Sequence, residues 1–298
     1  YTPHNDSEMN LIKPSEEVIK SLEAHQMELQ TMIGMGKFVD FFRDRVLTWQ
    51  NTLGLVEDVL KVWVNVSRSW SALESIFLAS ADIRSQLPDD TKRFEGLDGE
   101  FKELMKDAVT EPNVVSLCSV DGRLELLTET MKKLDACQKS LNEYLDQKKK
   151  IFPRFYFVSN VALLDMLANG TNPPKIMKYL GDCFDSLNEL TFVKDEQGNE
   201  NIKLGNEMTA KDGETLMMFE EFSLEGEVET YLNNLTEAMR VTLRHKLQEA
   251  YNAAAGWEVD KPRHEWLFYY PAQAVVTTTQ IYWTEEAETL DELKDRIK

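Results

Sequence analysis

The stretch TLGLVEDVLKVWVNVSRSWSALESIFLA, residues 52–79, decides the fold class of this chain. Its apolar side chains recur mostly at steps of three and four residues, which is the spacing of one face of an α-helix. The members of this stripe are Leu53, Val56, Val59, Leu60, Trp63, Val66, Trp70, Leu73 and Phe77. One helix over the whole stretch would be about 42 Å long at a rise of about 1.5 Å per residue. That length is typical of a helical bundle or an arm and is rare inside a compact enzyme.

The same periodicity extends the helical prediction over most of the chain. Ser15 is a predicted N-cap, because Glu16 and Glu17 follow it in a first turn whose dipole favours acidic residues. That helix should break at Gly34 and Gly36. Further helices are predicted over residues 38–49, 90–109, 123–149, 160–169, 174–180, 228–255 and 272–297. The aromatic residues expected in helix–helix cores are Trp49, Trp63, Trp70, Trp266, Phe268, Tyr269, Tyr270, Tyr282 and Trp283.

Residues 191–222 interrupt the helical pattern. A strand, a turn at residues 197–199 and a second strand are predicted there, and residues 214–222 are a candidate for a further strand. We therefore expect a mainly α fold, an elongated series of helical bundles with a small β-hairpin insertion at about residues 191–222. Residues 1–150 would form the first helical part, and residues 151–298 the second part with the insertion.

The charge balance excludes several classes of partner. The chain has 33 basic and 52 acidic residues and a net charge of −19. Neutralising phosphate needs an excess of lysine and arginine, so we expect neither a nucleic acid nor a membrane as partner. The spacing of Cys118, Cys137 and Cys183 fits neither a disulfide framework nor a zinc site. A reduced, cytosolic chain is the resulting expectation.

The motifs of common catalytic and metal sites are missing from the sequence. A P-loop is absent, and residues 34–37 are the nearest glycine-rich turn, which we interpret as a connection between helices. Residues 195–206 have the oxygen-rich look of a calcium loop, but the twelfth position is Asn206 instead of glutamate. We therefore predict no catalytic, cofactor-binding or metal-binding residue in this chain.

A joint is predicted at residues 151–160, where the segment IFPRFYFVSN follows a long helix. The cations Lys148, Lys149 and Lys150 suit a helix C-terminus, and the proline that comes next cannot continue a helix. Two interpretations stay open for the aromatic residues there. They fill the space between two helical bundles, or they form a hinge whose packing changes with state. The candidate hinge residues are Phe152, Pro153, Phe155 and Phe157.

Several stretches of this chain resemble the linker region of dynein heavy chains. The most telling is IFPRFYFVSNVALLDMLANGTNPPKIMKYLGDCFDSL, residues 151–187. Residues 214–222 followed by VETYLNNLTEAMRVTLR (residues 228–244), and EWLFYYPAQAVVTTTQIYWTEE (residues 265–286), add two more matches. WSALESIFLASADIRSQLPDDTKRFEGLDGEFKELMKDA, residues 70–108, is similar to axonemal members, above all to the β-class heavy chains of the ciliary outer arm.

The resemblance implies a function that periodicity alone does not indicate. In that family the linker is a helical mechanical arm that joins the tail to the first AAA+ module. It swings over a ring of six such modules as nucleotide turns over, which moves the motor along microtubules. This chain would be an internal, non-enzymatic segment, with ATP and Mg²⁺ bound by the ring of the parent protein. The expected location is the cytoplasm and cytoskeleton, in the axoneme of a cilium or flagellum.

The resemblance also names the expected partners. These are the AAA+ ring of the same heavy chain and, through the parent tail, other dynein subunits. The acidic tip of the β insertion, with Asp195, Glu196 and Glu200, is a candidate ring contact, and a merely solvated tip is the alternative. The alternative function is a helical scaffold or adaptor that binds partner proteins without catalysis. An adaptor would recruit another protein by itself, whereas a lever would bind its own ring in a nucleotide-dependent way.

Overall fold

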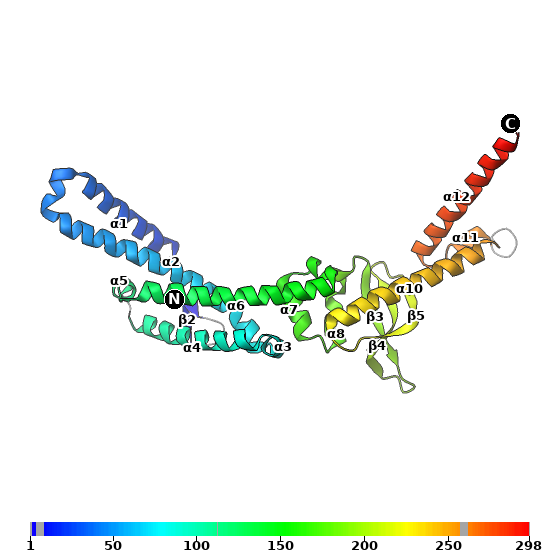
Figure 1. Ribbon diagram of the computed structural model, residues 1–298, viewed down its shortest axis with the longest axis horizontal. Coiled ribbons are helices and arrows are strands. Elements are labelled where there is room, and N and C mark those ends of the chain that lie inside the picture. The colour runs from blue at the N-terminus through cyan, green and yellow to red at the C-terminus, as the bar shows by residue number, and fades with distance from the viewer. Residues whose placement is uncertain (1, 4–8, 112, 257–261, 298) are drawn as a thin grey trace. The chain divides into compact units, whose positions relative to one another are not determined.

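The computed structural model describes residues 2–3, 9–111, 113–256 and 262–297 and is mainly helical (Figure 1). It divides into two compact units, residues 1–144 (unit 1) and residues 145–298 (unit 2). The boundary falls within helix α6 (Arg123–Ile151), and the division predicted after residue 150 lies at the C-terminal end of that helix. The predicted mainly α fold with a small β insertion is confirmed. None of the described helices is both long and apolar enough to cross a membrane.

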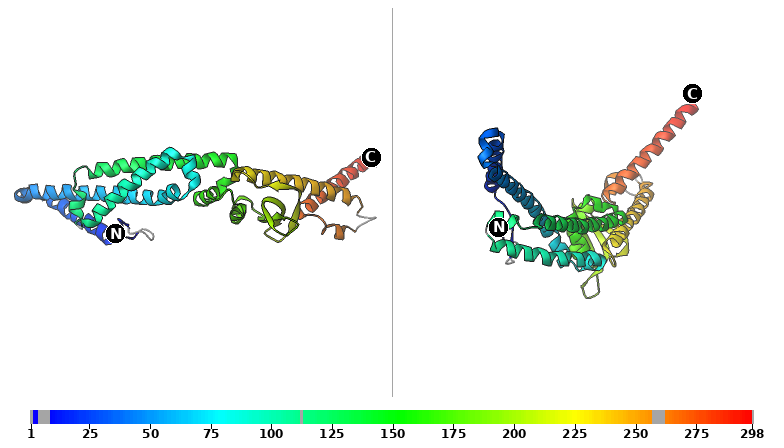
Figure 2. Two further views of the ribbon diagram at one scale, coloured as in Figure 1. Left: turned by 90° about the horizontal axis from the view of Figure 1, so that it is seen from below. Right: turned by 60° about the vertical axis from the view of Figure 1, so that its left-hand side comes forward.

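The first two long helices of unit 1 form a hairpin, which Figure 2 shows from two further directions. Helix α1 (Glu16–Gly34) starts at the predicted cap, where the Val18 N–H donates to Ser15 Oγ at 3.4 Å. The chain then turns at Gly36, whose positive φ of 61° suits glycine, into the short helix η1 (Gly36–Phe42). Helix α2 (Arg43–Ala79) runs back along α1. It includes the predicted helix of residues 52–79 and starts earlier, because no helix-breaking residue precedes it.

The core of unit 1 lies between α2 and the following helices, α3 (Ala81–Gln86), α4 (Pro88–Thr110), α5 (Val114–Cys118) and α6. Phe77 of α2 stacks on Phe94 of α4 with ring centroids 5.3 Å apart. Trp70 contacts Phe101 at 5.0 Å and donates its indole N–H to Asp98. A two-residue strand pair, β1 (Thr2–Pro3) with β2 (Asn10–Leu11), was not predicted.

Four of the aromatic residues predicted to lie in cores are exposed instead, and a fifth, Trp266, is buried as predicted. Trp49 is 46% exposed, because α1 and η1 cover one side of α2 in this hairpin and leave the other side open. Trp266 is buried and donates its indole N–H to the Ala250 carbonyl at 3.2 Å. In contrast, Phe268, Tyr269 and Trp283 point to solvent, since the small cluster around Trp266 buries only one face of this region.

After the end of α6, unit 2 continues with five short elements; the helix predicted over residues 160–169 is present, and the one predicted over residues 174–180 is divided among three of them. The five elements are η2 (Pro153–Phe157), α7 (Asn160–Ala168), α8 (Pro173–Ile176), η3 (Met177–Tyr179) and α9 (Leu180–Cys183). Ser159 caps α7, because its Oγ accepts the Ala162 N–H at 3.2 Å. These turns bring the chain from the end of α6 to the edge of a sheet.

The insertion is a three-stranded antiparallel sheet in the order β3 (Leu187–Lys194), β4 (Glu200–Ala210) and β5 (Thr215–Ser223). Glycine is required at residue 205, because an added Cβ would lie 2.6 Å from the ring of Phe222 on the neighbouring strand. Helix α10 (Val228–Ala254) covers the outer strand, and its Thr242 hydroxyl accepts the Phe219 N–H at 3.0 Å. The chain continues through α11 (Arg263–Trp266) and α12 (Ala272–Ile297).

Candidate functional site

The candidate site is the joint, defined as residues 151–160, together with the side chains of unit 2 that hold it. Helix α6 ends at Ile151, after three lysines in its last turn. The ring of Pro153 removes a backbone N–H, so the chain tightens into η2, with N–H to carbonyl contacts from Phe155 to Phe152 (3.0 Å) and from Val158 to Phe155 (3.1 Å). Two backbone hydrogen bonds therefore hold the joint in a short turn.

The four candidate hinge residues fall into two pairs. Phe152 and Phe155 are buried and meet edge to face, with centroids 4.9 Å apart. Phe152 also contacts the buried Phe184, which follows α9, at 6.2 Å. Pro153 is on the surface, and Phe157 is 78% exposed. The structure thus brings Phe152 and Phe155 together in the core of unit 2 and leaves Pro153 and Phe157 outside it.

Arg154 fastens the joint to the segment before the sheet. One of its guanidinium nitrogens donates to the Cys183 carbonyl at 3.1 Å, and the guanidinium carbon lies 4.6 Å from the centre of the Phe184 ring. A cation over an aromatic face is attracted by the ring quadrupole. Arg154 therefore closes the aromatic cluster from its solvent side.

A buried ion pair that the sequence did not reveal ties the end of α6 to the start of α10. Lys148 Nζ lies 2.5 Å from one oxygen of Glu229 and 3.4 Å from an oxygen of Glu227. The side chain of Glu229 is only 4% exposed. Asn233, one turn further along α10, donates its side-chain N–H to the Ile151 carbonyl at 3.0 Å, which satisfies an open carbonyl at the end of α6.

The electrostatics of this pair follow from its burial. Burial lowers the pKa of Lys148, but the hydrogen bond and charge of Glu229 outweigh it, so that the pKa lies above the ordinary value. Burial together with the charge of Glu229 raises the pKa of the neighbouring Tyr231. Lys148 lies on the face of α6 that carries Leu141, Tyr144 and Leu145, and this spacing is the only sequence signal that could have indicated its burial.

The three cysteines do not add a reactive group. Burial raises the pKa of Cys183 to about 12 and that of Cys118 to about 11, and it also raises the pKa of Cys137. A thiol with a raised pKa stays protonated at neutral pH and is a poor nucleophile. Within the described ranges, no three histidine, cysteine or acidic side chains gather closely enough to hold a metal ion.

The predicted ring-contact residues lie at the turn between β3 and β4. The carboxylate of Asp195 accepts the backbone N–H groups of Gln197 (2.9 Å) and Asn199 (2.8 Å) and the side-chain N–H of Asn199 (3.1 Å). These hydrogen bonds, the one from the Asn199 backbone above all, lower the pKa of Asp195. Glu200 lies 3.6 Å from Lys194 across the hairpin, and Glu196 is exposed. Asp195 therefore shapes the turn, whereas Glu196 presents its charge to solvent.

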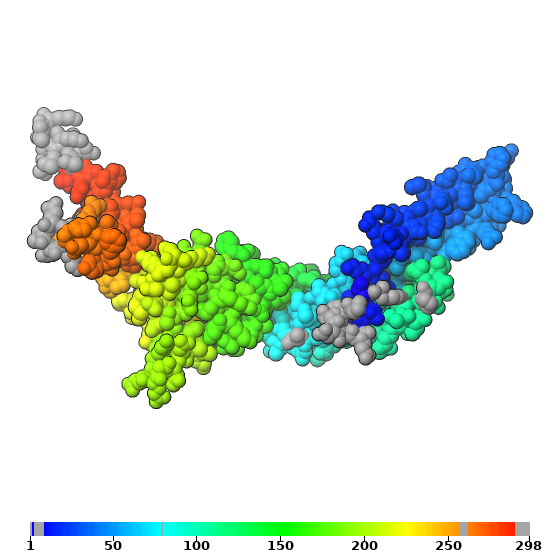
Figure 3. Space-filling model, turned by 180° about the vertical axis from the view of Figure 1, so that it is seen from behind, coloured from blue at the N-terminus to red at the C-terminus, as the bar shows by residue number. Residues whose placement is uncertain are grey.

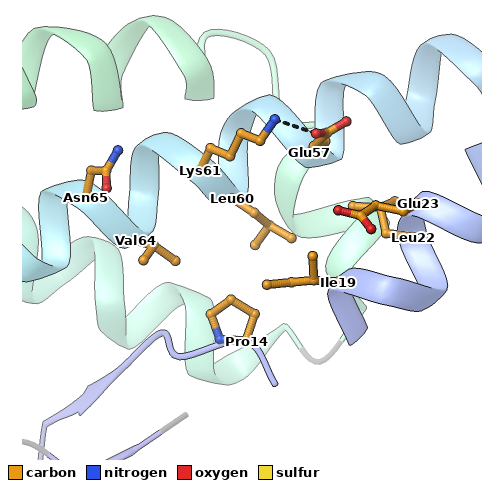
Figure 4. Close-up of a pocket in the computed structure, with 9 residues that line it drawn as sticks. All are labelled: Pro14, Ile19, Leu22, Glu23, Glu57, Leu60, Lys61, Val64 and Asn65. Carbon is orange, nitrogen blue, oxygen red and sulfur yellow. Dashed lines mark hydrogen bonds and ion pairs between the residues drawn. The ribbon is translucent and has the colours of Figure 1, made fainter. Parts of the chain in front are cut away.

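A separate apolar pocket of about 240 Å³ lies in unit 1 between α1 and α2 (Figure 4). Pro14, Ile19, Leu60 and Val64 form its walls. The charged side chains at its edge include Glu57 and Lys61, which are bonded to each other. Glu23 also lies at this edge, so the pocket combines apolar walls with a net acidic edge.

Comparison with known proteins gives consistent matches. Residues 1–250 match a family model described as dynein heavy chain, N-terminal region 2. The chain is 41% identical over 286 residues to the ciliary dynein beta chain of Tripneustes gratilla, and 42% identical over 286 residues to dynein axonemal heavy chain 9 of Homo sapiens. It is 39% identical over 299 residues to the flagellar outer arm dynein beta chain of Chlamydomonas reinhardtii.

These alignments cover nearly all of the present chain but little of each relative. They span 96% of this chain for the first two relatives and 99% for the third, and 6% of the length of each relative. The resemblance that the sequence motifs indicated, to axonemal heavy chains of the outer arm, is thus confirmed over almost the whole chain.

Proposed function

Because the chain belongs to the dynein heavy chain family, as part of the N-terminal region, we propose that it is the linker, a mechanical arm. In this proposal the parent heavy chain is an ATPase of the ciliary or flagellar axoneme, with ATP and Mg²⁺ bound in its AAA+ ring. The arm couples changes in that ring to displacement of the tail along microtubules. Its partners are the ring of the same heavy chain and, through the tail, other dynein subunits.

The observation that carries this proposal is the way α6 is held at the joint. An arm transmits force only if the end of each helix keeps its packing contacts under load. Close-packed protein interiors resist such displacement. The aromatic cluster of Phe152, Phe155 and Phe184, the Lys148–Glu229 pair and the Asn233–Ile151 hydrogen bond fix the end of α6 within unit 2. In the proposal, bending takes place at the joint, where the buried pair of rings and the exposed Phe157 rearrange together.

Phe157→Ala tests the hinge without disturbing the fold. Donor and acceptor fluorophores on the arm and the ring of the full heavy chain would report the nucleotide-dependent swing by energy transfer. We expect the variant to change the rate or amplitude of the swing at least twofold. Phe268→Ala, which removes another exposed ring of unit 2, is the matched control and should leave the swing unchanged.

The two levels of the proposal fail differently in this experiment. A normal swing in a correctly folded Phe157→Ala motor would exclude the hinge and leave the lever intact. A wild-type motor whose arm does not move with nucleotide would exclude the lever itself. That result would favour the alternative function, a scaffold. A scaffold requires a partner protein that binds the arm regardless of nucleotide.

The tip of the β3–β4 hairpin is the proposed ring contact, and Glu196 is the residue that tests it. Glu196→Lys reverses an exposed charge and leaves the hydrogen bonds of Asp195 in place. We expect the reversal to slow the swing and to weaken its dependence on salt. Glu189→Lys, which reverses an exposed acid on β3 away from the tip, is the control. A swing insensitive to Glu196→Lys at low and high salt would mean that the tip is merely solvated.

A further inference from the structure

The far half of the α1–α2 hairpin exposes large apolar side chains. Helix α1 has no buried residue, and Met27 and Met35 are open to solvent. In η1, at the turn of the hairpin, Phe38 is 91% exposed and Phe41 is also fully on the surface. Figure 3 shows this hairpin in blue, standing out from the other helices of unit 1. A pair of helices buries only the seam between them, so each helix keeps an apolar side that a third helix could cover.

A groove of about 430 Å³ lies at the turn of the hairpin. Its walls include Met32 of α1, Met35 at the C-cap of α1, Phe38 and Phe42 of η1, and Val46 and Trp49 of α2. Methionine is flexible and polarisable and adapts to varied apolar partners. A groove between two helices accepts the apolar stripe of a third helix, with anchors at steps of three and four residues.

The edge of the groove differs in charge from the rest of the chain. Among the described residues that line the groove, Arg45 is the one with a charged side chain, in a chain whose net charge is −19. Arg43 is paired with Asp40 at 2.7 Å. Arg45 lines the groove, and neither its side chain nor that of Lys37 has an ion pair or hydrogen bond to another described residue. A ligand helix with a carboxylate beside an apolar stripe would complement both the apolar groove and the charge of Arg45.

We propose that this groove binds an amphipathic α-helix of a partner protein, with a carboxylate next to its apolar stripe that pairs with Arg45. A second copy of the chain fits less well, because a two-fold contact of groove on groove would bring no carboxylate to Arg45: among the described residues, no acidic side chain lines the groove. An anionic membrane also fits less well, since the chain as a whole carries −19. The proposal does not depend on the swing of the arm, so the two can fail separately.

Two labelled helical peptides test the specificity of the groove. Both carry the same leucine and phenylalanine stripe, and one has glutamates and the other lysines along its flanks. Fluorescence anisotropy with the 298-residue chain, at about 0.15 M salt where screening acts beyond roughly 8 Å, measures their affinities. We expect the glutamate peptide to bind at least tenfold more tightly than the lysine peptide, and Arg45→Glu to reverse that preference.

Matched variants locate the binding site. Phe38→Ser should weaken the glutamate peptide at least tenfold, and Phe268→Ser, which changes a ring that is 89% exposed elsewhere, should leave the affinity unchanged. Equal affinity for both peptides, or normal binding to Phe38→Ser, would overturn the proposal. So would a dimer in sedimentation velocity that Phe38→Ser dissociates, because a second copy would then fill the groove.

Zero-length carbodiimide cross-linking in the assembled dynein identifies the source of the helix. Lys37 can join only a carboxylate in direct contact with it, and mass spectrometry identifies the linked peptide. A link from Lys37 to an acidic residue of a different polypeptide supports the proposal. A link to an acidic residue of the same heavy chain, or no link at all, overturns it.

Discussion

Replacing Phe155 with alanine is expected to destabilise unit 2 by about 3–5 kcal/mol, the usual cost of removing a buried aromatic ring. Phe155 is 0% exposed and packs edge to face against Phe152. The loss combines lost contacts with a cavity that the turn of η2 cannot close, because its backbone is tied by hydrogen bonds. Hydrogen exchange of amides in residues 152–158 would report it as roughly 100-fold or more loss of protection, at about 1.4 kcal/mol per tenfold.

The neighbouring Phe157→Ala serves as control, since this exposed ring should change the free energy of unfolding by less than about 0.5 kcal/mol. Amides of residues 91–105 in unit 1 give an internal reference in both variants. Equal losses of protection for the two variants would mean that the joint is not held by the pair of buried rings. The anchoring of α6, and the lever that rests on it, would then lose their structural basis.

Helical periodicity predicted most of the helices, but it did not show which of their apolar faces are covered by another element. The stripe on residues 52–79 correctly placed Trp63 and Trp70 in the core. The same reasoning failed for Trp49 and Phe268, because an apolar side chain at helical spacing shows which face it lies on and not whether another element covers that face. Turn chemistry was more reliable, as the cap at Ser15 and the break at Gly36 show.

Contacts between residues far apart in the chain could not be predicted from the sequence. Lys148 and Glu229 are separated by 81 residues, and each alone is typical of a solvated charge. The hairpin turn shows the same limit on a smaller scale. Asp195 is predicted as a ring contact, which stays a prediction, and the sequence did not indicate that its oxygens also accept the hydrogen bonds that form the turn. Local spacing does not distinguish an acid that shapes the backbone from one that awaits a partner.

Lys148→Met should destabilise unit 2 by about 3 kcal/mol or more, because it leaves the charge of Glu229 buried without a cation. One oxygen of Glu229 already lacks a hydrogen-bond partner among the described residues, so little else compensates the charge. Hydrogen exchange of residues 228–235 measures the effect directly. Lys106→Met, which breaks a pair whose side chains are both 72% exposed, should produce no measurable change.

The pH at which this variant is compared follows from the direction of the pKa shift. The pKa of Lys148 is raised in the folded chain, so the stabilisation by the pair is fully present below the ordinary lysine value of about 10.4. It is lost as the pH rises through the higher, folded-state pKa. The difference between wild type and Lys148→Met should therefore be constant from neutral pH to about pH 10 and shrink above it.

The double variant Lys148→Met, Glu229→Leu separates loss of the pair from loss of packing. Removing both charges eliminates the uncompensated carboxylate, and two apolar side chains of similar size can occupy the same space. We expect the double variant to recover most of the protection that Lys148→Met loses, a coupling that a double-mutant cycle measures. If the double variant is as unstable as Lys148→Met, the stem of Lys148 holds α6 through packing and the ion pair contributes little to the joint.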